Sequence, residues 1–136
     1  MTPTLEDVGL AVKRVQWRHH REANRRLAAV GLSLVQWDVL RHLHQQPEAS
    51  LHRLAELTFQ TDQSMGELAR RMIERGFIVR RDAPGRAVKH ALTDDGRRVH
   101  DAGAAVMHGV FQESLGTLSA EQRGTLYRLL MQAVEA

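Results

Sequence analysis

Residues 54–81 read LAELTFQTDQSMGELARRMIERGFIVRR, and this stretch decides the fold. Its central apolar residues recur at the three- and four-residue spacing of one buried helical face: Met65, Leu68, Ala69, Met72 and Ile73. Thr61 stands where an N-cap belongs, and Gly76 stands where a left-handed residue ends a helix. The stretch therefore predicts a helix that begins after Thr61 and stops just before Gly76.

The segments that flank this helix are short. Ser50 opens a brief helix through residues 51–58, and a break of a few residues separates it from Thr61. Downstream, the β-prone runs 77–81 and 87–92 flank the turn DAPG, which predicts a small basic hairpin. A short helix, a tight turn, a second helix and a hairpin form the order of a winged helix-turn-helix.

The rest of the chain is predicted to be helical. A long helix runs from Thr4 to about Val30, and a second helix begins after Ser33. Thr93 caps a helix that continues to about Leu115, and Ser119 with Gln122 forms a capping box for the last helix. The expected fold class is therefore mainly α with a small β-hairpin wing (α+β), in one domain of 136 residues.

Composition excludes several classes of protein. The chain has no cysteine, so disulfides, cysteine-ligated zinc and thiol chemistry are ruled out. No apolar run is long enough to cross a bilayer, and the N-terminus is acidic where a signal peptide is basic, so we expect a cytoplasmic protein with no membrane partner. The sequence contains no nucleophile elbow, phosphate-binding glycine loop or His-Glu-x-x-His motif, which predicts a protein that is not an enzyme and has no cofactor.

Basic charge is concentrated near the predicted hairpin. The net charge is only +3, yet residues 70–90 contain seven Arg or Lys residues against two acids. Nearly all of the basic side chains are arginines, whose planar guanidinium suits bidentate contacts to phosphate and guanine. This distribution favours a nucleic acid as the partner of the hairpin and its neighbouring helix.

The same residues resemble the MarR family of transcriptional regulators. The stretch 54–81 is similar to that family's helix-turn-helix, and Glu74-Arg75-Gly76 matches its turn into the wing. The run RAVKHALTDDG at 86–96 resembles the family's passage from the wing into the next helix, with Arg86 as the wing arginine. The chain departs from the family at Pro84, where an acid is usual, and at Glu67, where relatives often carry a basic residue.

The resemblance implies a homodimer that binds double-stranded DNA at a pseudo-palindromic operator. Residues 1–31 and 94–136 would form the dimerisation helices, and residues 33–93 would form the DNA-binding lobe. The helices of the first two segments also carry more apolar surface than a single chain of this size covers, which independently favours a two-fold dimer. The implied function is a sequence-specific regulator of transcription, a repressor relieved by a small aromatic or anionic effector.

Two sets of site residues follow. The helix that begins after Thr61 would present its exposed positions to DNA, and the wing would add cations. The predicted DNA-contacting residues are Thr61, Asp62, Gln63, Ser64, Glu67, Arg70, Arg71, Arg86 and Lys89. By analogy with regulators that bind aromatic anions, the predicted effector-binding residues are Trp17, Arg18, His20, Trp37, Arg41 and His42.

Two other functions remain open at the level of sequence. Asp62 and Glu67 place negative charge on the face that should meet DNA, which favours a winged-helix module that binds protein. The eight histidines raise the alternative of a metal-responsive regulator, in which His42 and His108 would converge from two helices. No cysteine and no suitably spaced glutamate accompanies them, so no metal site is expected.

Overall fold

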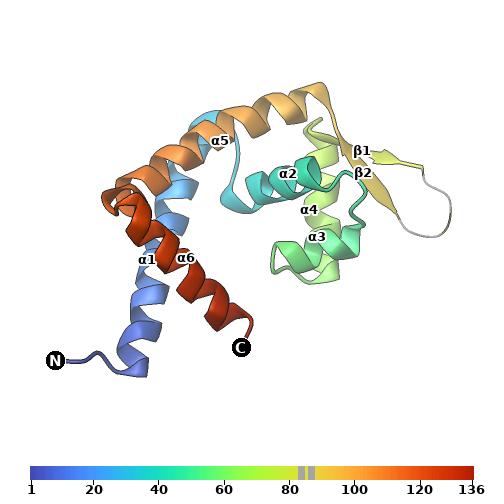
Figure 1. The fold of residues 1–136 in the computed structure, drawn as a ribbon. Coiled ribbons are helices and arrows are strands. Elements are labelled where there is room, and N and C mark those ends of the chain that lie inside the picture. The colour runs from blue at the N-terminus through green and yellow to red at the C-terminus, as the bar shows by residue number, and fades with distance from the viewer. Residues whose placement is uncertain (83–84, 86–87) are drawn as a thin grey trace.

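The structure is a computed structural model that describes residues 1–136 except 83, 84, 86 and 87. A long first helix and a long fifth helix lie against each other (Figure 1). The winged lobe lies at the N-terminal end of the fifth helix (Figure 1). The elements in chain order are α1 (Leu5–Leu27), the 3-10 turn η1 (Ala28–Val30), α2 (Leu34–Gln45), α3 (Leu51–Leu57), α4 (Asp62–Glu74), β1 (Ile78–Arg81), β2 (Lys89–Leu92), α5 (Asp94–Ser114), the 3-10 turn η2 (Leu115–Thr117) and α6 (Ala120–Val134). The predicted mainly α fold with a hairpin wing is confirmed.

The helix starts follow from capping side chains that the sequence already marked. Thr61 Oγ1 accepts a hydrogen bond from the Ser64 backbone N–H at 3.0 Å, and Thr93 Oγ1 accepts one from the Gly96 N–H at 2.9 Å. Ser33 and Ser119 each form a complete capping box. These bonds satisfy backbone donors that have no partner inside the helix, so the predicted starts are confirmed.

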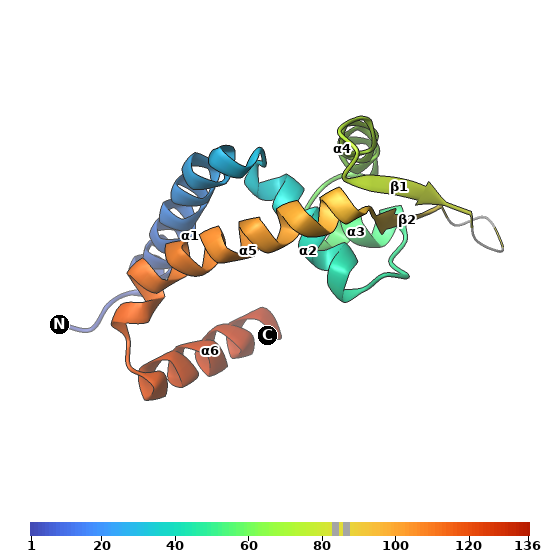
Figure 2. The same ribbon diagram turned by 90° about the horizontal axis from the view of Figure 1, so that it is seen from above.

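The winged lobe is built on one buried cluster. The apolar stripe of α4 faces inward except for Ile73, which is exposed. Its Met65 and Met72 are fully buried with Leu40 and Leu43 of α2. Strands β1 and β2 pair antiparallel, with Ile78 opposite Leu92, and the wing projects beyond the helices (Figure 2). Because the stripe fixes which side of α4 is covered, it also fixes which side of α4 faces solvent.

The passage from wing to α5 is a tight joint. Gly76 ends α4 with a φ of 79°, the left-handed conformation that favours glycine. Thr93 Oγ1 donates to the Gly76 carbonyl at 2.5 Å, and the Thr93 N–H donates to the Phe77 carbonyl at 3.0 Å. A Cβ on Gly96 would lie 1.9 Å from the Phe77 carbonyl oxygen, so only glycine fits at that position. The wing and the first turn of α5 are therefore held as one unit.

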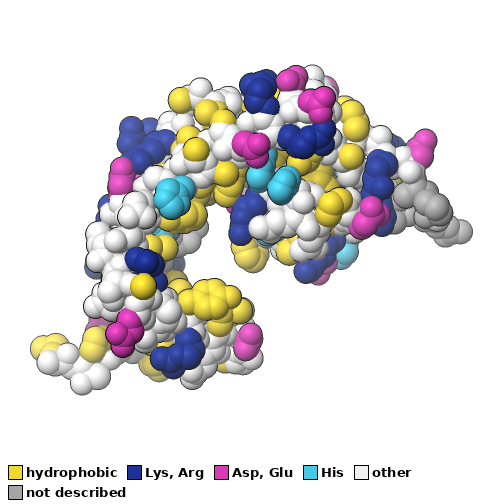
Figure 3. All heavy atoms as spheres, turned by 45° about the horizontal axis from the view of Figure 1, so that its top comes forward, with side chains coloured by type: hydrophobic (Ala, Val, Ile, Leu, Met, Phe, Trp, Pro, Cys, Tyr) yellow, Lys and Arg dark blue, Asp and Glu magenta, His cyan; other side chains and the backbone are white. Residues whose placement is uncertain are grey.

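The outer helices leave apolar side chains uncovered. Helix α6 buries none of its residues, and its Tyr127, Leu129 and Val134 are more than half exposed. Leu5 of α1 is 88% exposed, and hydrophobic side chains are visible on the surface at this end of the molecule (Figure 3). Arg26 of α1 pairs with Glu113 of α5, so α1 itself is anchored. Among the described residues, no helix combines the length and apolarity that a bilayer crossing requires.

The joint at Gly96 gives a stability prediction. We expect Gly96→Ala to lower the free energy of unfolding by about 3 kcal/mol, because its methyl group would overlap a backbone carbonyl that cannot rotate away. Gly66→Ala is the matched control, since a Cβ there meets nothing within 4 Å and alanine favours the helix by up to about 1 kcal/mol. Urea unfolding followed by circular dichroism measures both. Equal stability of the two variants would contradict the close contact between Gly96 and the Phe77 carbonyl.

Candidate nucleic-acid interface

The solvent-facing side of α4 carries the predicted DNA-contacting residues. Thr61, Asp62, Gln63, Ser64, Glu67, Arg70 and Arg71 are all exposed. The buried residues of α4 pack on the rest of the lobe, so the exposed side chains lie together on the opposite, solvent-facing surface. Gln63 and Ser64 are in the first turn, where a helix that enters a major groove approaches base edges.

Asp62 has a partner that the sequence analysis missed. Its Oδ1 lies 2.8 Å from Nδ1 of His52 on α3, and both side chains are 69% exposed. The hydrogen bond and charge of Asp62, with a smaller contribution from Glu56, raise the pKa of His52. The acid at the start of α4 therefore joins α3 to α4. A histidine at the first turn of the preceding helix was the available signal.

The arginines of α4 differ in their partners. Arg70 Nη1 lies 3.1 Å from Oε1 of Glu74, one helical turn away. Both groups are more than 60% exposed, so the ion pair contributes little to stability. Within the described part of the chain, Arg71 makes no ion pair, which leaves its guanidinium available to a phosphate.

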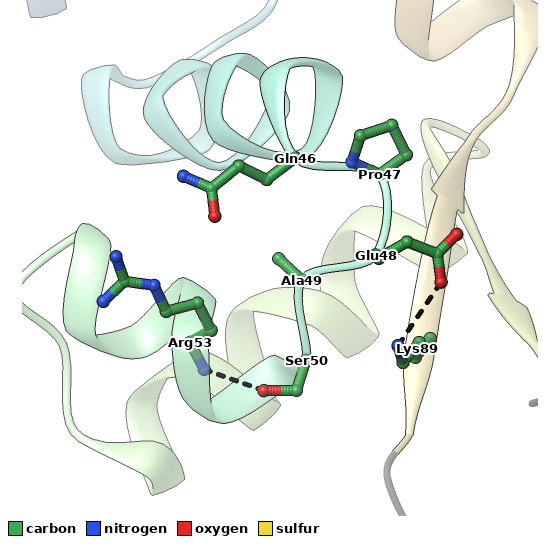
Figure 4. Close-up of a pocket in the computed structure, with 7 residues that line it drawn as sticks. All are labelled: Gln46, Pro47, Glu48, Ala49, Ser50, Arg53 and Lys89. Carbon is green, nitrogen blue, oxygen red and sulfur yellow. Dashed lines mark hydrogen bonds and ion pairs between the residues drawn. The ribbon is translucent and has the colours of Figure 1, made fainter.

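Two of the wing cations, Arg81 and Lys89, are paired with one glutamate. Glu48, in the connection between α2 and α3, forms ion pairs with Arg81 of β1 at 3.0 Å and with Lys89 of β2 at 3.3 Å. Both partners lower the pKa of Glu48, with Arg81 contributing most. Figure 4 shows Glu48 and Lys89 facing each other beside Ser50, whose hydroxyl caps α3. Arg86, the predicted wing arginine, and Pro84 lie outside the described residues.

A hollow of about 280 Å³ lies between α2 and α5. Trp37 lines this hollow and donates from Nε1 to the His100 carbonyl at 3.2 Å. The Arg41 guanidinium lies 6.0 Å from the centroid of Trp37, and the His44 and His100 rings stack at 4.5 Å. The full lining is Trp37, Arg41, His44, Gln45, His100, Ala104, Met107, His108 and Phe111. Its aromatic rings and its cationic group suit an aromatic anion.

The structure brings together only part of the predicted effector set. Trp37 and Arg41 line the hollow, whereas the other four predicted residues do not: Trp17, Arg18, His20 and His42. Trp17 and His20 stack on each other along α1, and Arg18 donates to the Glu113 carbonyl. The Nδ1 atom of His42 is buried, and this burial lowers its pKa. The lining residues that the sequence analysis missed are His44 and Gln45 at the end of α2 and a stripe on α5, whose facing side the sequence alone did not fix.

The pairing of His42 with His108 is not found. His108 lines the hollow with His44, while His42 points elsewhere on α2. Among the residues that the structure describes, no three His, Asp or Glu side chains are grouped as a metal ion requires.

The fold and the exposed face of α4 define a winged helix-turn-helix regulator. Comparison with known proteins specifies the family. The sequence model of the MarR family matches residues 30–87. The HTH-type transcriptional repressor Rv2887 of Mycobacterium tuberculosis is 30% identical over 111 residues, which cover 80% of each protein. This chain belongs to the MarR family. It is accordingly a regulator of transcription and not an enzyme, as the sequence predicted.

Two solved structures of the same relative resemble this chain over almost its full length. The complex of Mycobacterium tuberculosis Rv2887 with salicylic acid has a TM-score of 0.76 at 28% identity and covers 97% of both chains. The complex of Rv2887 with DNA has a TM-score of 0.76 at 27% identity and covers 97% of this chain and 98% of that one. The winged helix-turn-helix arrangement is thus shared across the whole domain.

The contact between His52 and Asp62 gives a pH prediction. Because the histidine pKa is raised, the ion pair stabilises the fold at low pH and is lost as pH rises through the raised value. Asp62→Asn should lower the pKa of His52 toward its ordinary range, as measured by NMR titration of the imidazole. Glu67→Gln, which removes an exposed acid from the same helix, should leave it unchanged. A His52 pKa indifferent to Asp62→Asn would contradict the contact.

Proposed function

We propose that this chain is a homodimeric transcriptional repressor that reads a pseudo-palindromic operator with α4 and is released by a small aromatic anion. The observation that carries the proposal is the exposed first turn of α4, capped by Thr61 and held in place by its buried stripe. The relative Rv2887, which is named a repressor, has been solved with DNA and with salicylic acid. A cytoplasmic location belongs to the same proposal because the proposed partner is DNA.

The proposed DNA contacts divide into two kinds. Gln63 and Ser64, in the first turn of α4, would hydrogen-bond to base edges in the major groove. Arg71 would bind phosphate. Arg70 would also bind phosphate once its ion pair with Glu74 is broken. Lys89 and Arg86 of the wing would meet the neighbouring minor groove or its phosphates. Asp62 would act mainly through His52, which orients α3 against α4.

Dimerisation is proposed through the outer helices. The uncovered apolar side chains of α1 and α6 are more than a stable monomer ordinarily exposes, and a second copy would cover both. In this division, residues 1–31 and 94–136 form the dimer and residues 33–93 form the DNA-binding lobe. A two-fold axis would set two copies of α4 about one DNA turn apart, roughly 34 Å.

A protein partner is the second candidate function. The two acids on the exposed face of α4 favoured it, since acids repel phosphate. The pairing of Asp62 with His52 accounts for one of the two, which leaves Glu67 as the remaining reason. The arginines nearby on the same helix favour DNA, so the protein-binding alternative has the weaker support.

The operator is testable by selection. The purified protein is mixed with a pool of genomic fragments at two salt concentrations, and the retained DNA is sequenced. We expect a pseudo-palindrome with half-sites about 10 base pairs apart, and an affinity that falls steeply with salt. Failure to enrich any sequence at either salt, with retention of a protein partner instead, would favour the alternative.

Variants separate the two kinds of contact. Gln63→Ala should change the selected sequence with little change in salt dependence. Arg71→Ala should weaken binding across sequences and reduce the slope of log affinity against log salt by about 1. Arg25→Ala, on α1 and paired with Glu22, is the matched control and should change neither.

The effector proposal assigns binding to the hollow between α2 and α5. With salicylic acid as the probe, Arg41→Gln should weaken binding by roughly tenfold, because a charge-assisted hydrogen bond to the carboxylate is lost. Arg18→Gln is the matched control, since Arg18 lies on α1 outside the hollow. Titration calorimetry on the dimer measures both. A larger loss of affinity in Arg18→Gln than in Arg41→Gln would contradict this site and indicate binding at α1.

A further inference from the structure

Phe59 lies in the turn between α3 and α4, and its side chain is not part of the hydrophobic core. Its side chain is 95% exposed, so the ring contacts almost nothing. Its φ is 58°, and it is the one non-glycine residue with a positive φ among the described residues. An exposed phenylalanine in a left-handed backbone conformation is unfavourable on two counts, because it exposes an apolar ring to water and strains its own backbone.

The backbone around Phe59 explains why the strain cannot relax. The Gln60 N–H donates to the Ala55 carbonyl at 2.8 Å, and the Phe59 N–H donates to the Glu56 carbonyl at 3.3 Å. These two bonds form the Schellman ending of α3, in which the residue after the C-cap must be left-handed. Glycine or asparagine usually occupies this position. The ending of α3 therefore fixes the direction in which the phenylalanine ring leaves the backbone.

Phe59 lies close to the N-terminal end of α4. It lies two residues before the N-cap Thr61 and four residues before Gln63, in the turn that joins α3 to α4 (Figure 1). The pair between His52 and Asp62 ties the start of α4 to α3 across this turn. The backbone of Phe59 is therefore held next to the end of α4 that the proposed function directs into the major groove.

We propose that Phe59 is a DNA-contacting residue that adds sequence preference at the edge of each half-site. Its ring packs on apolar surface of the duplex, either a thymine 5-methyl group or the face of a deoxyribose. This inference rests on the proposed DNA-binding function and adds a hydrophobic contact to its polar and charged ones. The contact explains why the turn holds a phenylalanine where the backbone favours glycine.

The test uses the dimeric full-length protein and a duplex carrying the selected pseudo-palindrome. Phe59→Gly removes the ring and relieves the left-handed strain, so the melting temperature should stay level or rise by up to about 4 °C. Affinity for the duplex should nevertheless fall by about fivefold or more, with an unchanged salt slope. Phe59→Asn should behave like glycine, and Phe59→Tyr should retain binding because it keeps the ring.

Duplexes with uracil in place of thymine identify the surface contacted. If the ring touches a methyl group, one such substitution weakens the wild type and not Phe59→Gly; if it touches deoxyribose, uracil has no effect while the loss in Phe59→Gly persists. Wild-type affinity in Phe59→Gly overturns the inference and leaves the proposed function intact. A loss of affinity that tracks a fall in melting temperature also overturns it. Failure of the wild type to select any duplex overturns both.

Discussion

The close contact between the first turn of α5 and Phe77, the residue that leads into the wing, fixes the position of the winged lobe relative to α5. Gly96 packs directly on the Phe77 carbonyl, and Thr93 bonds both the Gly76 and the Phe77 carbonyls. Without a side chain at Gly96, the wing strands and α4 are joined to α5 with no compliant linker between them. The direction of α4 is therefore set by the direction of α5.

Helix α5 then carries each functional region in turn. Its beginning holds the wing, its middle lines the hollow with Trp37 and Arg41, and its end pairs with α1 through Glu113 and Arg26. A helix of this length is stiff on the scale of such a domain. A ligand that changes the separation of α2 and α5 would thus act on the same helix that orients the DNA-reading lobe.

The sequence predicted the elements well because each has a local cause. Capping residues such as Thr61 and Ser119, and the apolar stripe of α4, act over a few residues and are legible without the fold. The sequence could not show which of the predicted effector-binding residues line one hollow, because this depends on the rotation of α2 and α5 relative to each other. His42 and His44 are two positions apart, and only the packed structure shows that His44 faces α5. The pairing of Asp62 with His52 depends likewise on how α3 meets α4.

Glu48 gives the wing an electrostatic character that its composition hides. Arg81 and Lys89 share this one carboxylate, so the cations of the two strands are already neutralised in part before any polyanion arrives. Docking on a phosphate would then exchange one anion for another and displace fewer mobile counterions than the number of basic residues suggests. The exchange would be favourable only for a phosphate that contacts Arg81 and Lys89 as closely as Glu48 does. These two cations would accordingly favour a duplex whose phosphates are well placed, and they would add little indiscriminate attraction.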